Sequence, residues 1–390
     1  MQPAEIRGLS ALAFKAAEGG VDAVEDMHLS IAGRSFAAVG PLAAPVKLLH
    51  DGVARSVYGV LKAGTRALGN LTLVVLDRAP LPTGGGRLLD SRRGAMLGAA
   101  LNGAFGDHLA RENSALATAM ALRVGPGPAS GRIAIFVHGL METDRSWFPG
   151  DRVGRSFGSR LQKDLGYTPV FVVYNSGLHV SENGRRLAAE LEGLVARWPV
   201  AITELALIGH SMGGLVARSA CHYGDAEAMS WPSLVRHVVS LGTPHLGAPL
   251  EKAAHLGQAV LAALPETRAM SRLLGLRSAG IRDLRHGYLV DEDWSSEHAR
   301  GLLEDSCSEI PLLASAAHYF VAATLASSPT SLAGRLLGDI LVWYPSASGQ
   351  GRSRRIPFQA ENGRHIGGIS HFDLLYHPAV YEHLRGWLSV

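Results

Sequence analysis

Cysteine is scarce in this sequence, which contains only Cys221 and Cys307 among 390 residues. Two cysteines are too few for a disulfide framework, so we expect a reducing, cytoplasmic compartment. The N-terminus lacks a basic segment followed by a continuous apolar core, which argues against a cleaved signal. The charge-free stretch 311–334 is interrupted by Pro329 and diluted with Ser and Thr, which makes it a poor membrane span.

An excess of one charge is also absent. The 37 Lys and Arg residues stand against 34 Asp and Glu residues, for a net charge of +3 with neutral His. No dense basic run interleaved with aromatic residues occurs, so we expect no nucleic-acid partner. The 47% of hydrophobic residues in a chain of this length is ample for a substantial core.

Residues 1–123 show helical periodicity and little strand signal. Apolar residues recur at helical spacing over 21–31, over 49–68 after a breaker at 41–45, and over 93–111. These stripes are predicted to pack on one another or on the following domain. The alternative is that one amphipathic face contacts a lipid surface or a partner.

Residues 124–131 (VGPGPASG) read as a linker, and strands and helices alternate after it. The predicted strands are 132–137, 169–174, 205–208, 235–241 and 319–325, and the predicted helices are 156–165, 182–198 and one at the C-terminus. This alternation predicts an α/β fold over residues 132–390, with a doubly wound, mainly parallel sheet. Residues 246–317 break the rhythm and are expected to form a helical cap over the site.

The stretch 203–218 (TELALIGHSMGGLVAR) is the centre of the predicted site. A buried strand turns sharply into a helix with Ser211 at the apex, which is the arrangement of a nucleophile elbow. Side chains at Gly209 and Gly213 would collide with the neighbouring chain. The pentapeptide alone is also compatible with a glycine-rich turn of a nucleotide-binding fold.

A serine nucleophile needs a base, and the base needs an acid that holds its tautomer. His371 lies on a glycine-flanked loop before the last helix, and it is preferred over His365 and His377. Asp339, 32 residues earlier, is the predicted acid. Other aspartates fit less well, because three lie in the cap and one is too close to His371; these are Asp283, Asp291, Asp293 and Asp373.

Two backbone N–H groups are needed to stabilise the developing oxyanion. Met212, directly after the nucleophile, is predicted to supply one, and Leu140 of the HGL turn the other. His138, together with Gly139, is expected to shape that turn. His210 is next to the nucleophile without being placed to deprotonate it.

Five motifs together resemble α/β-hydrolase lipases and esterases, in particular the group similar to the GPI-inositol-deacylase hydrolase domain. They are FVHGL (136–140), GHSMGG (209–214), SLGTPHLGAPL (240–250), GDILV (338–342) and SHFDLL (370–375). The resemblance covers roughly residues 130–390. It implies an α/β-hydrolase fold, hydrolysis of carboxylic esters, and neither cofactor nor metal.

Carried over residue by residue, the resemblance implies Ser211 as nucleophile, Asp339 as acid and His371 as base, with Leu140 and Met212 as oxyanion donors. Such lipases often read G-D-G-L-V-P at the acid, whereas Ile340 here replaces the second glycine.

The sequence therefore predicts a lipase or esterase that acts on a small-molecule or lipid ester with an apolar acyl group. A thioesterase, an acyltransferase or an intracellular polyester depolymerase would use the same three residues. A lipid-surface or scaffolding protein with a vestigial hydrolase fold is the alternative from another class.

Overall fold

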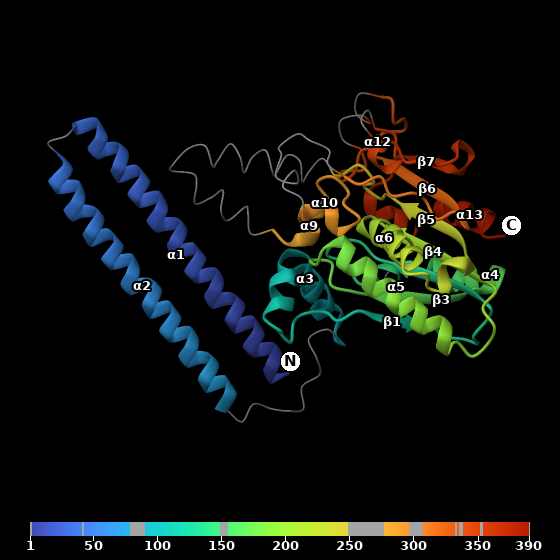
Figure 1. Ribbon diagram of the computed structural model, residues 1–390, viewed down its shortest axis with the longest axis horizontal. Coiled ribbons are helices and arrows are strands. Elements are labelled where there is room, and N and C mark those ends of the chain that lie inside the picture. The colour runs from blue at the N-terminus through green and yellow to red at the C-terminus, as the bar shows by residue number, and fades with distance from the viewer. Residues whose placement is uncertain are drawn as a thin grey trace. The chain divides into compact units, whose positions relative to one another are not determined.

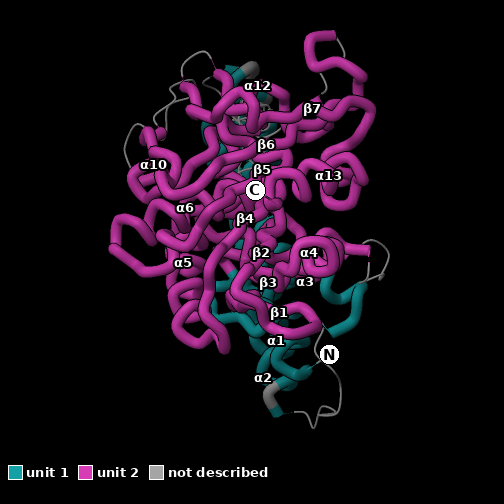
Figure 2. The backbone as a smooth tube through the Cα atoms, turned by 90° about the vertical axis from the view of Figure 1, so that its right-hand side faces the viewer, with its two compact units in different colours: residues 1–95, 109–116, 253–277 teal, residues 96–108, 117–252, 278–390 magenta. Residues whose placement is uncertain are grey.

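A computed structural model describes residues 2–40, 43–78, 90–148, 155–248, 277–295, 307–331, 334, 338–351 and 354–389 (Figure 1). The chain divides into two compact units (Figure 2). Unit 1 comprises residues 1–95, 109–116 and 253–277, and unit 2 comprises 96–108, 117–252 and 278–390. Within the cap expected over 246–317, residues 249–276 and 296–306 lie outside the described residues.

Unit 1 contains two long helices, α1 (Pro3–Val39) and α2 (Ala44–Arg78), which pair along their length. The contact between them includes both ion pairs and aromatic rings, such as Phe36 against His50. Lys62 Nζ lies 3.0 Å from Asp22 Oδ1 and 2.7 Å from Glu25 Oε2, and Arg66 Nε lies 3.1 Å from Glu18 Oε2. None of the helices in the described part of the chain is long and apolar enough to cross a membrane.

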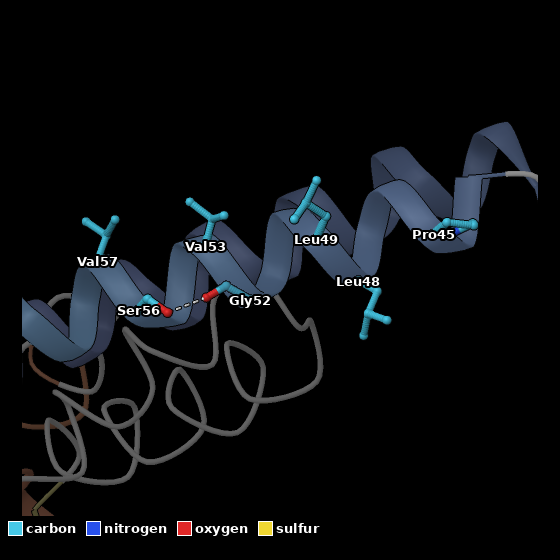
Figure 3. Close-up of a pocket in the computed structure, with 7 residues that line it drawn as sticks. All are labelled: Pro45, Leu48, Leu49, Gly52, Val53, Ser56 and Val57. Atoms are coloured by element: carbon cyan, nitrogen blue, oxygen red, sulfur yellow. Dashed lines mark hydrogen bonds between the residues drawn. The ribbon is translucent and has the colours of Figure 1, made fainter.

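The apolar residues of α2 form an exposed stripe. Leu49, Val53 and Val57 are 70%, 57% and 53% exposed, and their spacing of four residues places them on one helix face. Figure 3 shows their side chains rising from the same side of α2. With Pro45 and Leu48 they line a shallow hollow of about 600 Å³. The expected periodicity is thus present, and Leu49, Val53 and Val57 also border His28 of α1 around a second hollow of about 560 Å³.

Unit 2 is built on a seven-stranded sheet in the order β1-β3-β2-β4-β5-β6-β7. The strands are β1 (Ala121–Val124), β2 (Arg132–Val137), β3 (Thr168–Val173), β4 (Glu204–His210), β5 (Val235–Leu241), β6 (Ala317–Thr324) and β7 (Gly363–Gly367). Every neighbouring pair is parallel except β1 with β3. The predicted doubly wound, mainly parallel sheet is confirmed.

Helices connect the strands and cover both faces of the sheet. They are α3 (Arg92–Arg111), α4 (Phe157–Leu165), α5 (Val180–Arg197), α6 (Met212–Ala226), α9 (Ala279–Asp283), α10 (Asp291–Ser295), α12 (Tyr344–Ala347) and α13 (Pro378–Trp387). Single 3₁₀ turns lie at Asp144–Trp147, Trp231–Leu234, Ala360–Asn362 and His371–Leu375. Helix α3 spans both units, because residues 96–108 cluster with the sheet.

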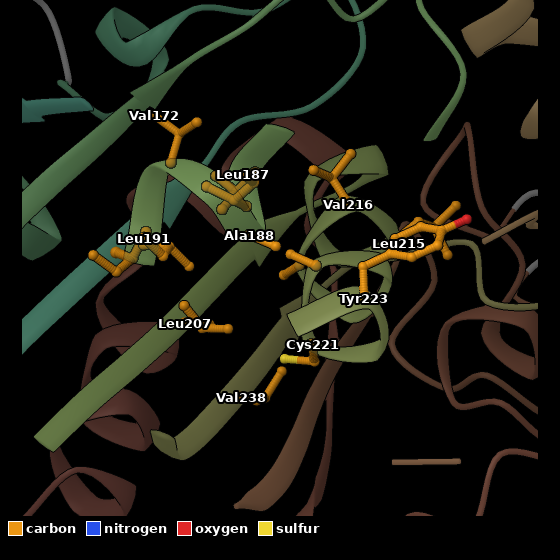
Figure 4. Packing of buried hydrophobic residues seen from close by; sticks show 14 of the residues in the cluster. Val172, Leu187, Ala188, Leu191, Leu207, Leu215, Val216, Cys221, Tyr223 and Val238 are labelled. Carbon is orange, nitrogen blue, oxygen red and sulfur yellow. The ribbon is translucent and has the colours of Figure 1, made fainter. Parts of the chain in front are cut away.

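The strand residues divide between two cores by the two-residue period of a strand. Ile133 and Leu207 pack with α5 and α6 on one face, whereas Phe136 and Ile208 pack with α4 and α13 on the other. Figure 4 shows the first core, in which α5 and α6 cover the central strands. Both faces of the central sheet are buried. For this reason β2 and β4 are continuous apolar runs rather than alternating ones.

The sheet is wider than the sequence predicted. Strand β1 lies at the end of the stretch expected to be helical, and β7 was not predicted. Both are edge strands whose residues are largely half-buried or exposed, so neither carries a strong apolar pattern. Residues 338–342, around Asp339, form a series of turns and bends.

Three non-glycine residues at the carboxyl ends of strands have a positive φ. They are Met141 after β2, Ser211 after β4 and Ile340 after β6, with φ of 58°, 53° and 94°. A β-branched residue with a positive φ is a genuine outlier, and such strain costs about 1–3 kcal/mol. Ile340 thus bears strain at the position where the lipase-like pattern has glycine.

Replacing Ile340 with glycine is expected to raise the free energy of unfolding by about 1 kcal/mol, because glycine adopts this φ without strain. The Ile340 side chain is 60% exposed, so little buried surface is lost. Denaturant titration measures the change. Leu341→Gly is the control and should be destabilising, since Leu341 has a negative φ. Equal destabilisation by both variants would contradict the assignment of strain to Ile340.

Candidate active site

Ser211 forms the turn between β4 and α6. Its backbone has φ 53° and ψ −125°, and its N–H donates to Leu241 O at 2.8 Å. The hydroxyl lies at the carboxyl edge of the sheet and at the N-terminus of α6, where the helix dipole favours negative charge.

Glycine is required on both sides of this serine. A Cβ at Gly209 would lie 2.5 Å from the Cα of Gly214, and one at Gly213 would lie 2.2 Å from Val137 O. Backbone atoms cannot give way cheaply at such distances, so the turn closes only because both positions lack a side chain.

Asp339 and His371 are buried side by side, each about 1% exposed. His371 Nδ1 donates to Asp339 Oδ2 at 2.6 Å, and the backbone N–H of His371 donates to Asp339 O at 3.1 Å. Asp339 Oδ1 accepts the N–H groups of Leu341 and Val342 at 3.0 and 2.7 Å. The carboxylate is therefore fixed from both sides, and with Nδ1 protonated, His371 Nε2 is left as an acceptor.

His371 and Ser211 flank the same short segment, Leu241–Gly242. A Cβ on Gly242 would lie 3.0 Å from His371 Cε1, so this glycine makes room for the imidazole ring. His371 Nε2 is buried and bonds to no described residue, and accordingly no hydrogen bond joins it to Ser211 in this structure.

The turn after β2 lies against Ser211. A Cβ on Gly139 would come within 3.0 Å of Ser211 Cβ. Met141 N–H is already used, since it donates to Ser176 Oγ at 3.1 Å. Among the described hydrogen bonds, none uses the N–H of Leu140 or Met212, which leaves both donors available to a ligand.

A buried ion pair connects this turn to the loop of His371. Glu142 accepts the N–H of Gly139 at 2.8 Å and approaches His210 Nδ1 at 3.0 Å. His210 Nε2 donates to His371 O at 3.1 Å. Because both ring nitrogens face oxygen acceptors, both must carry protons, and His210 is an imidazolium.

Glu142 and His210 each shift the pKa of the other in the direction that favours its charged form. Burial by itself lowers the pKa of His210, but the charge and hydrogen bond of Glu142 outweigh it and raise that pKa overall. Burial by itself raises the pKa of Glu142, and the charge and hydrogen bond of His210 bring it below its usual value. The pair therefore stays ionised around neutral pH.

The remaining histidines of the predicted site have structural partners. His138 Nδ1 donates to Gly139 O at 2.9 Å and its ring stacks on Tyr174. His365 lies on β7 and its Nε2 is 2.8 Å from Thr324 Oγ1. His377 caps α13 by accepting the N–H of Ala379 at 3.2 Å.

The alternative acids are engaged elsewhere. Asp283 accepts the N–H of Val180 at 2.7 Å and bonds His179, which caps α5. Asp293 accepts Ser308 N–H at 2.6 Å within the cap. Asp291 pairs with Arg185, and Asp373 caps its own turn through Ser370.

Sequence reasoning missed the part of α3 that supports the site. Asn175 Nδ2 donates to Gly106 O at 2.9 Å, and a Cβ on Gly103 would lie 3.1 Å from the backbone of Met141. Two glycines three residues apart on one helix face signal such a close approach. Glu142 was also missed, although an acidic residue just after the HGL turn was visible in the sequence.

No group of three or more His, Cys, Asp or Glu side chains within the described ranges is arranged to hold a metal ion.

Residues 190–310 match the family model of the PGAP1-like alpha/beta domain. No curated protein matches the chain significantly. The lipase BlEst2 of Bacillus licheniformis in its propeptide form is 20% identical with a TM-score of 0.50, over 69% of this chain and 54% of that one. This chain thus aligns with about half the length of that structure.

Two further solved structures are similar at lower scores. The mature form of BlEst2 is 20% identical with a TM-score of 0.45, over 70% of this chain and 98% of that one. A soluble variant of monoglyceride lipase from Saccharomyces cerevisiae is 13% identical with a TM-score of 0.41, over 70% and 91%. Residues 190–310 are thus similar to the PGAP1-like alpha/beta domain, and the chain adopts the α/β-hydrolase fold.

Proposed function

We propose that this protein is a serine hydrolase that cleaves carboxylic esters of apolar acyl groups. Ser211 is the nucleophile, His371 the general base and Asp339 the acid that orients it. The observation that carries the proposal is the buried hydrogen bond from His371 Nδ1 to Asp339 Oδ2, at the sheet edge where Ser211 also lies. This bond fixes the tautomer in which Nε2 accepts a proton.

In the proposed reaction, Ser211 Oγ attacks the ester carbonyl while its proton moves to His371 Nε2. The N–H groups of Leu140 and Met212 hold the resulting oxyanion, and removal of one such donor typically costs about 10²–10³ in rate. The alcohol leaves with the proton from His371. Water, activated by His371, then releases the acid and restores Ser211.

The preference for an apolar substrate is supported by three exposed side chains. Met141, Ile340 and Phe372 directly follow Leu140, Asp339 and His371, and they are 42%, 60% and 50% exposed. Apolar surface of this kind next to polar reacting groups is typical of sites that bind acyl chains. The same machinery serves a thioesterase, an acyltransferase or a polyester depolymerase. Assaying p-nitrophenyl esters of graded chain length beside acyl-CoA separates these activities.

The Glu142–His210 pair has a positioning role in this proposal. It joins the N–H of Gly139, next to the oxyanion donor Leu140, to the carbonyl of His371. A shift of either loop would break a buried charged hydrogen bond, which is costly in a low-dielectric environment. The pair thereby keeps the oxyanion donor and the base in one arrangement.

Contact with a lipid surface through the N-terminal helices belongs to the same proposal. The side chains of Leu49, Val53 and Val57 are each more than half exposed. An exposed apolar helix face is suited to lie in a lipid interface.

Turnover of a short-chain p-nitrophenyl ester tests the three roles. Ser211→Ala and His371→Ala should each lower kcat by at least about 10³, and Asp339→Asn by about 10⁴ through the wrong tautomer. Asp283→Asn is the matched control and should leave kcat largely unchanged where the protein folds. Near-normal turnover of the Asp339→Asn variant would contradict the assignment of the acid.

The pH dependence tests the positioning pair. In Glu142→Gln, burial lowers the pKa of His210 without a compensating anion, so His210 loses its second proton as the pH rises. Because His210 of the variant then titrates below about 6.5 and His210 of wild type above it, the ratio of kcat/KM in the variant to that of wild type should fall by about tenfold between about pH 4 and about pH 7. His371 and Asp339 also face His210 and are retained in both proteins.

Glu227→Gln, on an exposed residue after α6, is the control for a general effect of charge removal. If the ratio of kcat/KM in Glu142→Gln to that of wild type does not change with pH, the Glu142–His210 pair is not ionised.

Flotation of the full chain with phosphatidylcholine vesicles tests the lipid contact. Wild type should float, and the triple variant L49Q/V53Q/V57Q should remain at the bottom, because each change removes exposed apolar surface. Arg55→Gln on the same helix is the control. Absence of flotation, or a stripe-dependent dimer in sedimentation, would refute the lipid contact.

A further inference from the structure

A second cavity in unit 2, of about 280 Å³, lies outside the proposed catalytic residues. Its walls come from α6, from the loop after β5, and from residues 308–311 and 354–357. Arg218, at the α6 wall, follows Ser211 by seven residues, which corresponds to a rise of about 10 Å along the helix. The cavity is therefore distinct from the site of the proposed reaction.

Arg218 is a buried cation without a carboxylate partner. It is 5% exposed, and it forms no salt bridge with any residue of the described part of the chain. Its Nη1 donates to His245 Nδ1 at 3.3 Å and its Nη2 to Ile310 O at 3.2 Å. A guanidinium has five N–H donors, so these two neutral acceptors satisfy only part of it.

His245 adds a donor to the same cavity. Arginine only donates, so His245 Nδ1 accepts from Arg218 and the ring proton is on Nε2. Nε2 is buried and has no hydrogen-bond partner among the described residues. Burial, and then the charges of Arg218 and Arg354, hold the pKa of His245 well below its usual value, so the ring is neutral.

The remaining charges of the cavity wall are mostly positive. Arg354 and Arg355 also line it, against one carboxylate, Glu309, which is solvent-exposed. Arg354 Nη2 is held at 2.6 Å by both His245 O and His286 O. Burial, followed by the charge of Arg354, lowers the pKa of Arg218 to about 10, as expected for a cation without an anion beside it.

Buried cations of this kind are costly unless an anion compensates them. Arg218, Arg354 and Arg355 all line the cavity, and guanidinium groups suit oxyanions. We propose that this cavity binds the oxyanion group of a small molecule, a phosphate or a carboxylate. At about 30 Å³ for each displaced water, its volume accommodates such a group with several further atoms.

Calorimetric titration of the full chain with inorganic phosphate and, separately, with acetate tests the proposal at constant ionic strength. One of the two anions should bind at one site per chain and raise Tm progressively as the logarithm of its concentration increases, whereas matched chloride should not. Which of the two binds more tightly distinguishes a phosphate group from a carboxylate group.

Substitutions locate the binding site. Arg218→Gln and Arg355→Gln should each weaken binding by at least about tenfold, since each removes a charged donor. Arg236→Gln, an exposed arginine at the start of β5, should bind as wild type. Arg355 is solvent-exposed, so its substitution leaves the fold intact and its variant supplies the answer where Arg218→Gln fails to fold.

The proposal is overturned if neither anion binds more tightly than chloride, or if the Arg355 variant and the Arg236 variant bind equally well. Ester turnover by the same proteins is measured separately. Binding of an anion without ester turnover would contradict the proposed hydrolase and leave the anion site standing. Ester turnover without binding of an anion would contradict the anion site and leave the proposed hydrolase standing.

Discussion

The parallel arrangement of β2, β4, β5 and β6 is the constraint on which the proposed site depends. Because these strands run in one direction, the loops that follow them meet at a single edge. The turn of Gly139, the elbow of Ser211, Gly242 and the loop of Asp339 are the continuations of those four strands. His371 joins them after β7, so residues up to 232 positions apart in sequence come to share one site.

Buried charge holds this edge together. The Asp339–His371 and Glu142–His210 pairs each combine a carboxylate with an imidazole, and the carbonyl of His371 bonds to His210. Removal of one partner would leave an uncompensated buried group, so the pairs specify one arrangement of the loops. Strain at Ser211 and Ile340 is retained in the same place, where the surrounding contacts over-determine the backbone.

Much of the fold followed from periodicity, because strands buried on both faces are continuous apolar runs. β2 and β5 have the bounds that the sequence predicted. The edge strands β1 and β7 could not be found in this way, since their half-exposed residues lack an apolar pattern. The sequence indicated Ser211, Asp339 and His371 as a set, and the structure places the last two in contact. The roles of Glu142 and of α3 depend on long-range contacts, which no local pattern encodes.

The central claim is that Ser211 is an activated nucleophile, and covalent labelling tests it most directly. Wild-type protein treated with a fluorophosphonate should gain one adduct, which mass spectrometry of its peptides should assign to Ser211. His371→Ala should label far more slowly, because the hydroxyl then lacks its base. Absence of an adduct on Ser211 in folded protein, or labelling at equal rates without His371, would contradict the account.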